Sequence, residues 1–262
     1  MTSANPWEKY QFSEGQALFW HLGPLELFIK ASPHDWRIFY KHDLDPLLIH
    51  EEFNPNADLP ENTNTYQIER YVTADPYSSL QLSPLLSDIP VVARPELTLK
   101  VPPKESTIIY VSTPLWIKAT YDKNHPLFEL PVFRLSDTWF GPNPTDGELC
   151  YSIKTAARIN LSELPVRTYR AITEVRIINK SSQTMTVDRV KIPLQYFSLF
   201  KNNQTNLFYT DNLIFEKDKD EEFQARILPA SKQEAGKNIK IAPPRVSLKD
   251  NLILNKLKAF LT

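Results

Sequence analysis

The chain has 262 residues, a formal net charge of -1 and 42% hydrophobic residues, so it can form one large or two small domains with an apolar core. The near-neutral charge creates no long-range field that would attract nucleic acid or an anionic membrane, and we expect no nucleic-acid partner. A single cysteine, Cys150, excludes an intramolecular disulfide.

Proline is frequent, with 22 residues, and glycine is scarce, with 5. The prolines divide the chain into short pieces rich in aromatic and β-branched residues, which is typical of strands. No stretch approaches about 18 apolar residues, so we expect no membrane-spanning segment. The N-terminal "MTSANPWEKYQF" lacks the basic and apolar pattern of a secretory signal, and we expect a cytoplasmic protein.

The first hundred residues predict a β-rich region. Residues 25–29 and 36–41 alternate with a period of two on either side of a turn at 32–35, and this pattern predicts a hairpin. Residues 53–66 are polar and predict a surface loop. The Pro102-Pro103 pair follows a further predicted strand and is a candidate domain boundary.

The following residues contain clearer strand patterns. Residues 106–121 predict two strands separated by a proline break. "ITEVRIINKSSQTMTVDRVKIPL", residues 172–194, predicts strand, turn and strand, with Val175 and Ile177 facing the core. The apolar phase slips at Asp188-Arg189, where we expect a β-bulge. Residues 205–228 predict a strand and another hairpin, which turns at residues 217–220.

Taken together, these elements predict a mainly β fold made of one or two antiparallel β-sandwiches of immunoglobulin-like character. We expect an N-terminal β-rich region over residues 1–100 and a β-sandwich over 101–230. Residues 231–262 would form a linker and a C-terminal amphipathic helix.

The tail "SLKDNLILNKLKAFLT" has apolar residues at helical spacing after a plausible N-cap, Ser247. One interpretation is a terminal helix docked on its own domain. The other is a helix that binds a partner or a membrane surface. In that second case the contacts would be made by Leu252, Ile253, Leu257, Phe260 and Leu261.

Four of the five histidines lie in the first fifty residues, next to acidic residues. Imidazole and carboxylate groups are good ligands for a divalent metal. One hypothesis is therefore a metal-dependent enzyme, although neither H-E-x-x-H nor a zinc-type Cys/His spacing occurs. The metal ligands would be His42, Asp43, His50 and Glu51.

Motifs for other chemistries are absent. The sequence has no G-x-S-x-G nucleophile motif, no dinucleotide-binding G-x-G-x-x-G and no phosphate-binding loop, so we expect no cofactor. Cys150 lies in an alternating apolar stretch, which favours a buried, unreactive thiol. Asp137 and Glu148 flank the turn cluster of residues 141–147 and are a candidate acid pair for glycoside hydrolysis.

Aromatic residues suggest a ligand-binding alternative. Exposed indole rings bind the C–H face of a sugar, although aromatic rings more often fill the core between sheets. The stretch "SDTWFGPNP" is the best place for such a platform because its aromatic pair adjoins a turn. The candidate ligand-binding residues are Trp36, Trp116, Trp139 and Phe140.

Four stretches, "LFWHLGPLELFIKASPHDWRI", "PPKESTIIYVSTPLWI", "DTWFG" and "YRAITEVRIINKSSQTMTVDRVKIPL", resemble an uncharacterised prokaryotic family, domain of unknown function 432. The resemblance covers roughly residues 15–230 and leaves the tail outside. It implies no activity and no catalytic residues. It does imply an accessory role, because members of this family occur beside membrane channel proteins of the mechanosensitive type.

We therefore expect a non-enzymatic interaction protein that binds a protein partner through β surfaces or the C-terminal helix. A membrane channel protein is one candidate partner, and self-association through an exposed strand edge is another. The alternatives are a carbohydrate- or small-ligand-binding module and a metal-dependent enzyme.

Overall fold

The computed structural model describes residues 6–73, 79–122, 125–141, 143, 145–219, 223–230 and 238–247. Within these ranges the chain is mainly β, as predicted, and its helical elements include three single turns, η1 (Thr63–Thr65), η2 (Leu161–Glu163) and η3 (Leu194–Tyr196). No helix in the described part is long and apolar enough to cross a membrane. The predicted C-terminal helix, apart from its N-cap Ser247, lies outside the described residues.

The chain divides into two compact units whose segments alternate along the sequence. Unit 1 comprises the residues up to Leu85 together with Leu115–Arg134, and unit 2 comprises Leu86–Pro114 and the residues from Leu135 onward. The chain therefore passes from one unit to the other three times. This division differs from the predicted boundary after residue 100, which lies inside unit 2.

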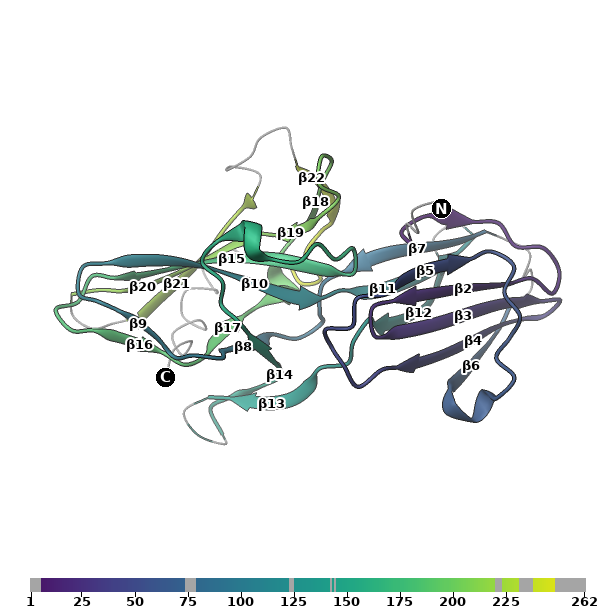
Figure 1. Ribbon diagram of the computed structural model, residues 1–262, viewed down its shortest axis with the longest axis horizontal. Helices are drawn as coiled ribbons and strands as arrows, with labels where there is room; N and C mark the ends of the chain where they lie inside the picture. Colours follow the sequence, from purple (N-terminus) through teal and green to yellow (C-terminus); the bar gives the residue numbers. More distant parts are fainter. Residues whose placement is uncertain are drawn as a thin grey trace. The chain divides into compact units, whose positions relative to one another are not determined.

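Unit 1 contains two sheets in which every pairing is antiparallel. The first sheet has the order β5 (Glu51–Asn54), β2 (Ala17–Leu22), β3 (Leu25–Ser32), β4 (Asp35–His42) and β6 (Gln67–Val72). The second has the order β1 (Lys9–Tyr10), β7 (Leu80–Leu85), β11 (Trp116–Tyr121) and β12 (His125–Pro131) (Figure 1).

The predicted hairpin is confirmed as β3 and β4, which pair from Leu25↔His42 to Ser32↔Asp35. Its period of two arises because alternate side chains point to opposite faces. On one face Leu27 and Ile29 have no exposed surface. Aromatic contacts connect the two sheets of the unit. For example, the Trp20 indole N–H donates to the Tyr10 hydroxyl at 3.4 Å.

Unit 2 contains a seven-stranded sheet, a four-stranded sheet and a strand pair (Figure 1). The seven-stranded sheet comprises β21 (Phe223–Leu228), β20 (Asn212–Lys217), β15 (Arg170–Asn179), β19 (Phe208–Thr210), β18 (Leu199–Asn202), β22 (Asn238–Ala242) and β10 (Ser106–Pro114). The others comprise β13 (Ser136–Phe140), β14 (Glu148–Thr155), β8 (Val91–Pro95) and β17 (Val190–Ile192), and β16 (Met185–Val187) with β9 (Leu99–Val101).

The predicted antiparallel arrangement does not extend through unit 2. Strand β14 runs parallel to β8, and β15 runs parallel to both β19 and β20. Parallel neighbours are joined by long connections rather than tight hairpins, so local turn patterns cannot indicate them. The hairpin expected near residues 217–220 is confirmed, because β20 and β21 pair antiparallel on either side of it.

The stretch 172–194 folds as strand, turn and strand, but its two strands do not pair with each other. Val175 and Ile177 are fully buried in β15, as predicted. The return strand is interrupted at Asp188-Arg189, where we expected a bulge. On one side of this break β16 pairs with β9, and on the other β17 pairs with β8. The slip in apolar phase therefore marks a change of sheet.

A buried asparagine holds the turn after β15 in place. The Asn179 side chain has no exposed surface, and its amide nitrogen donates to the carbonyls of Val101, Pro102 and Gln183 at 2.8–3.0 Å. Its amide oxygen accepts hydrogen bonds from the Ser181 backbone N–H and hydroxyl. This one side chain thus forms hydrogen bonds with backbone groups of two separate segments. Without these bonds the buried backbone groups would be unsatisfied, which costs free energy.

An ionic cluster spans the edge of the five-stranded sheet. Arg37 and Arg70 are directly opposed on β4 and β6, an arrangement that is unfavourable for like charges. The buried carboxylate of Asp35 accepts hydrogen bonds from both guanidinium groups. Burial is the largest single influence on this carboxyl and acts to raise its pKa, but the Arg70 hydrogen bond and the two positive charges together hold the pKa below its ordinary value.

We predict that Asp35→Asn lowers the free energy of unfolding at pH 7 by about 1–2 kcal/mol, a modest value because both arginines are half exposed. Since the folded-state pKa is depressed, the carboxylate stabilises the fold above the ordinary carboxyl pKa and loses this effect as the pH falls through the folded value. The difference between the two proteins should therefore shrink in acid. Urea unfolding from pH 7 to pH 3 measures it, with the exposed Asp58→Asn as control, and a pH-independent difference contradicts the prediction.

Candidate functional site

The histidines proposed as metal ligands point to different partners. His42 Nε2 lies 2.9 Å from the carbonyl oxygen of Pro131, and His50 Nε2 lies 3.3 Å from a carboxylate oxygen of Glu52. In the described ranges no three His, Cys, Asp or Glu side chains are grouped closely enough to hold a metal ion. The structure therefore does not bring together the four proposed ligands, His42, Asp43, His50 and Glu51.

Of the four proposed ligand-binding aromatic residues, one is exposed. Trp36 and Trp116 lie in the core of unit 1, and Phe140 lies in the core of unit 2, with 0%, 6% and 3% of their surface exposed. These three rings are buried in the cores and therefore present no exposed face on which a ligand could pack. Trp139 is 48% exposed and is available as a platform.

The Trp139 ring is held in a defined position by the adjoining turn. Its indole N–H donates to the carbonyl of Asn143 at 3.1 Å, and its ring packs against the Cα of Gly147, where a Cβ would lie 2.6 Å from ring atom Cε2. Directly across the strand pair lies Leu149, which is 52% exposed. Trp139 and Leu149 thus form an apolar surface pair on β13 and β14, and β13 is the edge strand of its sheet.

Asp137 and Glu148 do not form an acid pair. Glu148 is the cross-strand partner of Phe140, whereas Asp137 has the same parity as Trp139 on β13. Successive residues of a strand point to opposite faces, so the two carboxylates lie on opposite faces of the sheet. Glu148 instead forms an ion pair with the buried Lys191.

Cys150 lies on the buried face of β14 and packs with Val92 and Phe140. It has no exposed surface. Burial raises the pKa of its thiol to about 12, with a smaller contribution from Glu148. A nucleophilic cysteine must be accessible and must form a thiolate. This thiol is buried, and its raised pKa disfavours the thiolate.

A pocket of about 200 Å³ opens on unit 2 where the seven-stranded sheet divides. Strand β10 occupies one edge of β15 along its length, and the other edge is shared by β19, which pairs with Ala171 and Ile172, and β20, which pairs from Val175 onward. The residues that line the pocket include Tyr110, Ile172, Glu174, Tyr209, Asn212 and Asn238.

A bulge separates the two paired stretches. Two residues of β15 lie between Ile172 and Val175. On the neighbouring strands β19 and β20, three residues lie between the corresponding partners, Tyr209 and Leu213. Such an extra residue interrupts pairing and redirects side chains, and bulges are frequent beside active sites. The extra residue leaves space beside β15, and this space becomes the pocket.

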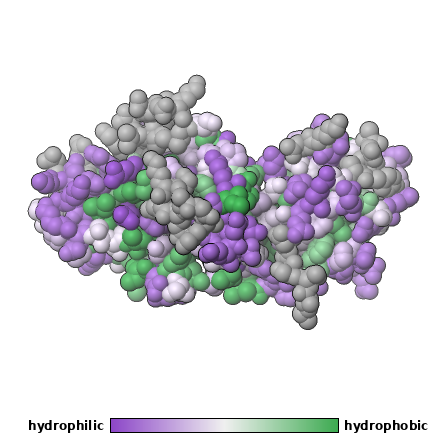
Figure 2. All heavy atoms as spheres, turned by 90° about the horizontal axis from the view of Figure 1, so that it is seen from above, coloured by the Kyte–Doolittle hydropathy of each residue, from purple (hydrophilic) through white to green (hydrophobic). Residues whose placement is uncertain are grey.

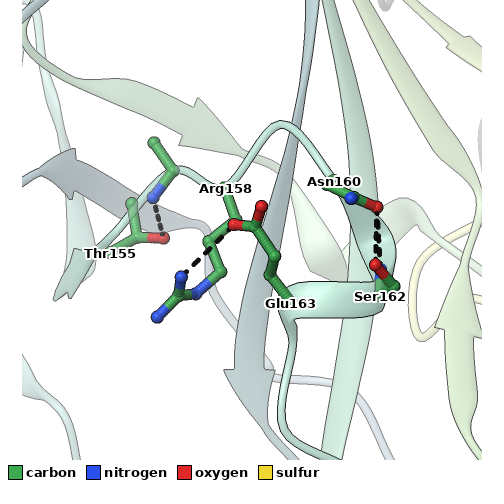
Figure 3. A network of polar contacts seen from close by, with 6 residues as sticks. Thr155, Arg158, Asn160, Ser162 and Glu163 are labelled. Atoms are coloured by element: carbon green, nitrogen blue, oxygen red, sulfur yellow. Dashed lines mark hydrogen bonds and ion pairs between the residues drawn. The ribbon is translucent and has the colours of Figure 1, made fainter.

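The loop of residues 155–163 contributes Leu161 to the pocket wall, and Figure 3 shows its polar contacts. Asn160 caps η2 by accepting hydrogen bonds from the Ser162 N–H and hydroxyl. Arg158 and Glu163 form an ion pair at 3.4 Å. Tyr110 N–H donates to the Arg158 carbonyl at 2.8 Å, which attaches this loop to β10. Leu161 is thereby held in a defined position.

Hydrogen bonds also order the bulge. The Asp211 carboxylate accepts hydrogen bonds from the backbone N–H groups of Ser198 and Ala230, at 2.7 and 3.1 Å. The Thr210 hydroxyl lies 2.8 Å from the Thr173 hydroxyl. The bulge beside the pocket, including the lining residue Thr210, is therefore held in place before any ligand binds, which reduces the entropic cost of binding.

Sequence reasoning missed this pocket because its lining residues are distant from one another in the chain. One local signal does exist: in "LFYTDNLIF", residues 207–215, three polar residues interrupt an otherwise apolar strand. In a chain this rich in strands, such an interruption indicates a bulge.

A family model matches residues 6–261, nearly the whole chain, and its description is "Protein of unknown function (DUF432)". The chain belongs to this family. The match confirms the resemblance seen in the sequence and also extends through the tail, which that resemblance had left outside. No curated protein and no solved structure matches the chain.

The five apolar tail residues proposed to bind a partner lie outside the described residues: Leu252, Ile253, Leu257, Phe260 and Leu261. Their role as a partner-binding helix face stays a prediction.

We predict that Gly147→Ala displaces the Trp139 ring, because the added methyl group would overlap it. The indole N–H would lose its acceptor, the Asn143 carbonyl, and the protein would lose about 1 kcal/mol of stability. The indole ¹H–¹⁵N resonance of Trp139 should shift strongly, whereas the control Ser136→Ala should leave it in place. An unchanged resonance in Gly147→Ala contradicts the packing described above.

We predict that Cys150 resists iodoacetamide in the folded protein. With a thiol pKa of about 12, roughly one molecule in ten thousand carries a thiolate at pH 8, and burial denies the reagent access. Labelling followed by mass spectrometry should be slow in buffer and fast in urea. Rapid labelling of the native protein would show that the thiol is accessible and activated.

Proposed function

We propose that the protein is a non-enzymatic, cytoplasmic accessory protein that binds a protein partner through an exposed β surface. The observation that carries this proposal is the apolar pair of Trp139 and Leu149 on the edge of the four-stranded sheet. In the described parts of the chain, β14 is the one strand that pairs with β13. A partner strand could therefore pair with the other edge of β13 while its apolar side chains pack on the Trp139 ring.

Several features of unit 2 support binding by surface contact rather than catalysis. Large apolar side chains reach its surface, and Figure 2 shows hydrophobic residues among the hydrophilic ones on the face that is in view. Trp139 and Leu149 are directly opposed on neighbouring strands, and adjoining exposed apolar side chains of this kind can mark an interaction site. The exposed members are Leu97, Trp139, Leu149, Ile159, Val166, Ile239, Ile241 and Val246.

The partner in this proposal is a protein, and a membrane channel protein is the candidate that the family resemblance implies. The C-terminal segment would add a second contact. Self-association through the edge strand β22 is a further form of the same proposal, supported by the exposed Ile239 and Ile241.

A second candidate function is carbohydrate or small-ligand binding by Trp139. The half-exposed, fixed indole ring favours it, since such a ring can pack against a sugar face. A saturable shift of the Trp139 indole resonance on addition of a sugar would support this alternative.

The test compares affinity capture from host lysate by four proteins: the wild type, Leu149→Glu, the control Leu97→Glu and a chain ending at Ser247. Leu97 is 81% exposed, so the control adds the same charge to another apolar surface site of unit 2. We expect at least a tenfold loss of one specific protein with Leu149→Glu and little change with Leu97→Glu. If only the chain ending at Ser247 fails to capture the partner, the contact is instead assigned to the tail. Equal capture by all four proteins would overturn the proposal.

A further inference from the structure

We propose that the pocket beside β15 binds an organic ammonium group, with the Glu174 carboxylate as its counter-ion and the Tyr110 and Tyr209 rings around it. This proposal is independent of partner binding at Trp139, because the two features lie on different sheets of unit 2. The argument rests on the strand register, on the charge of the lining and on the order of the pocket base.

Strand register places the three side chains on one face of the sheet. Tyr110 is directly opposite Glu174 in the antiparallel pair of β10 and β15, and directly opposed side chains lie about 5 Å apart. Ile172, two residues before Glu174, points to the same face and pairs with Tyr209. Because Ile172 is 5% exposed, it forms an apolar base between the two tyrosines.

The charge of the lining favours a cation. Among the described residues that line the pocket, Glu174 is the one acidic side chain, and none of them is basic. Glu174 forms an ion pair with Arg176, which does not line the pocket. The distance between Arg176 Nη2 and Glu174 Oε1 is 3.6 Å, and the Arg176 side chain is 42% exposed. A long, exposed ion pair of this kind neutralises the carboxylate weakly, so an anion would be repelled from the pocket.

The two tyrosines add to this preference. An aromatic ring attracts a cation to its face, and cages of aromatic rings with an acidic residue recognise ammonium groups. Burial and the neighbouring Glu174 charge raise the pKa of Tyr110, so this phenol stays protonated and can also donate a hydrogen bond. A neutral sugar would satisfy the hydroxyl groups but would leave the carboxylate with only its long contact to Arg176.

The size of the pocket limits the ligand. About 200 Å³ is less than the roughly 300–1,000 Å³ that is usual for drug-sized ligands. An alkylammonium chain of four or five carbon atoms is of suitable size. Such a group could belong to a free small amine or to the lysine side chain of a peptide.

The experiment follows backbone amide shifts of the full chain during titration with three probes: butylammonium chloride, Nα-acetyl-lysine amide and the neutral analogue pentanol. We expect saturable shifts around Ile172 and Tyr209 with either ammonium compound, and at least tenfold weaker binding of pentanol. Tighter binding of the lysine compound would assign the source to a peptide, and tighter binding of butylammonium would assign it to a free amine.

Two matched variants separate charge from folding. Glu174→Gln removes the proposed counter-ion. Glu216→Gln is the control, since Glu216 has the same 20% side-chain exposure and an ion pair of its own with Lys180. We expect Glu174→Gln to weaken ammonium binding at least tenfold and Glu216→Gln to change it less than twofold.

Three results would overturn the proposal: no saturable binding of either ammonium compound, equal binding of pentanol, or ammonium binding that survives Glu174→Gln. Preferential binding of glucose in the same assay would replace the ammonium ligand with a sugar. Partner capture through Leu149 is measured in a separate experiment. A negative ammonium titration therefore does not affect the proposed function, and a negative capture experiment does not affect the proposed ammonium site.

Discussion

The pairing of β10 with β15 is the constraint on which unit 2 depends. The ladder runs from Ser106↔Ile178 to Pro114↔Arg170 and occupies one edge of β15 along nearly all of its length. The other two neighbours of β15 must therefore share its second edge. Strands β19 and β20 pair in parallel with successive parts of that edge. The pocket forms at their junction. On the opposite face of β15 lie buried side chains of the core, including Val175 and Ile177, which have no exposed surface.

Local patterns predicted the individual strands well. The period of two in residues 25–41 identified the β3–β4 hairpin because alternation directly reflects which face of a strand is buried. The proline break before Leu115 also had physical meaning, since the chain passes between the two units there. The phase slip at Asp188-Arg189 was located correctly, although it marks a change of sheet rather than a bulge.

Pairing partners and exposure could not be predicted in the same way. Nothing local in β15 specifies that its neighbours are β10, β19 and β20, because side-chain alternation encodes a face and not a partner. Residue type does not distinguish the exposed Trp139 from the buried Trp36 and Trp116. Only the adjoining turn favoured Trp139, and the structure gives the reason: Gly147 leaves room for the ring to lie against the backbone.

The alternation of the two units along the chain affects how the protein is made. Strand β10 leaves the ribosome well before its partner β15, and between them the chain supplies residues 115–134 to unit 1. Unit 1 is itself incomplete until those residues emerge. Domains usually fold one after another during synthesis, but here neither unit can be completed by an uninterrupted N-terminal segment. The nascent chain must therefore carry unpaired strand edges for longer, which increases its exposure to aggregation and its dependence on chaperones.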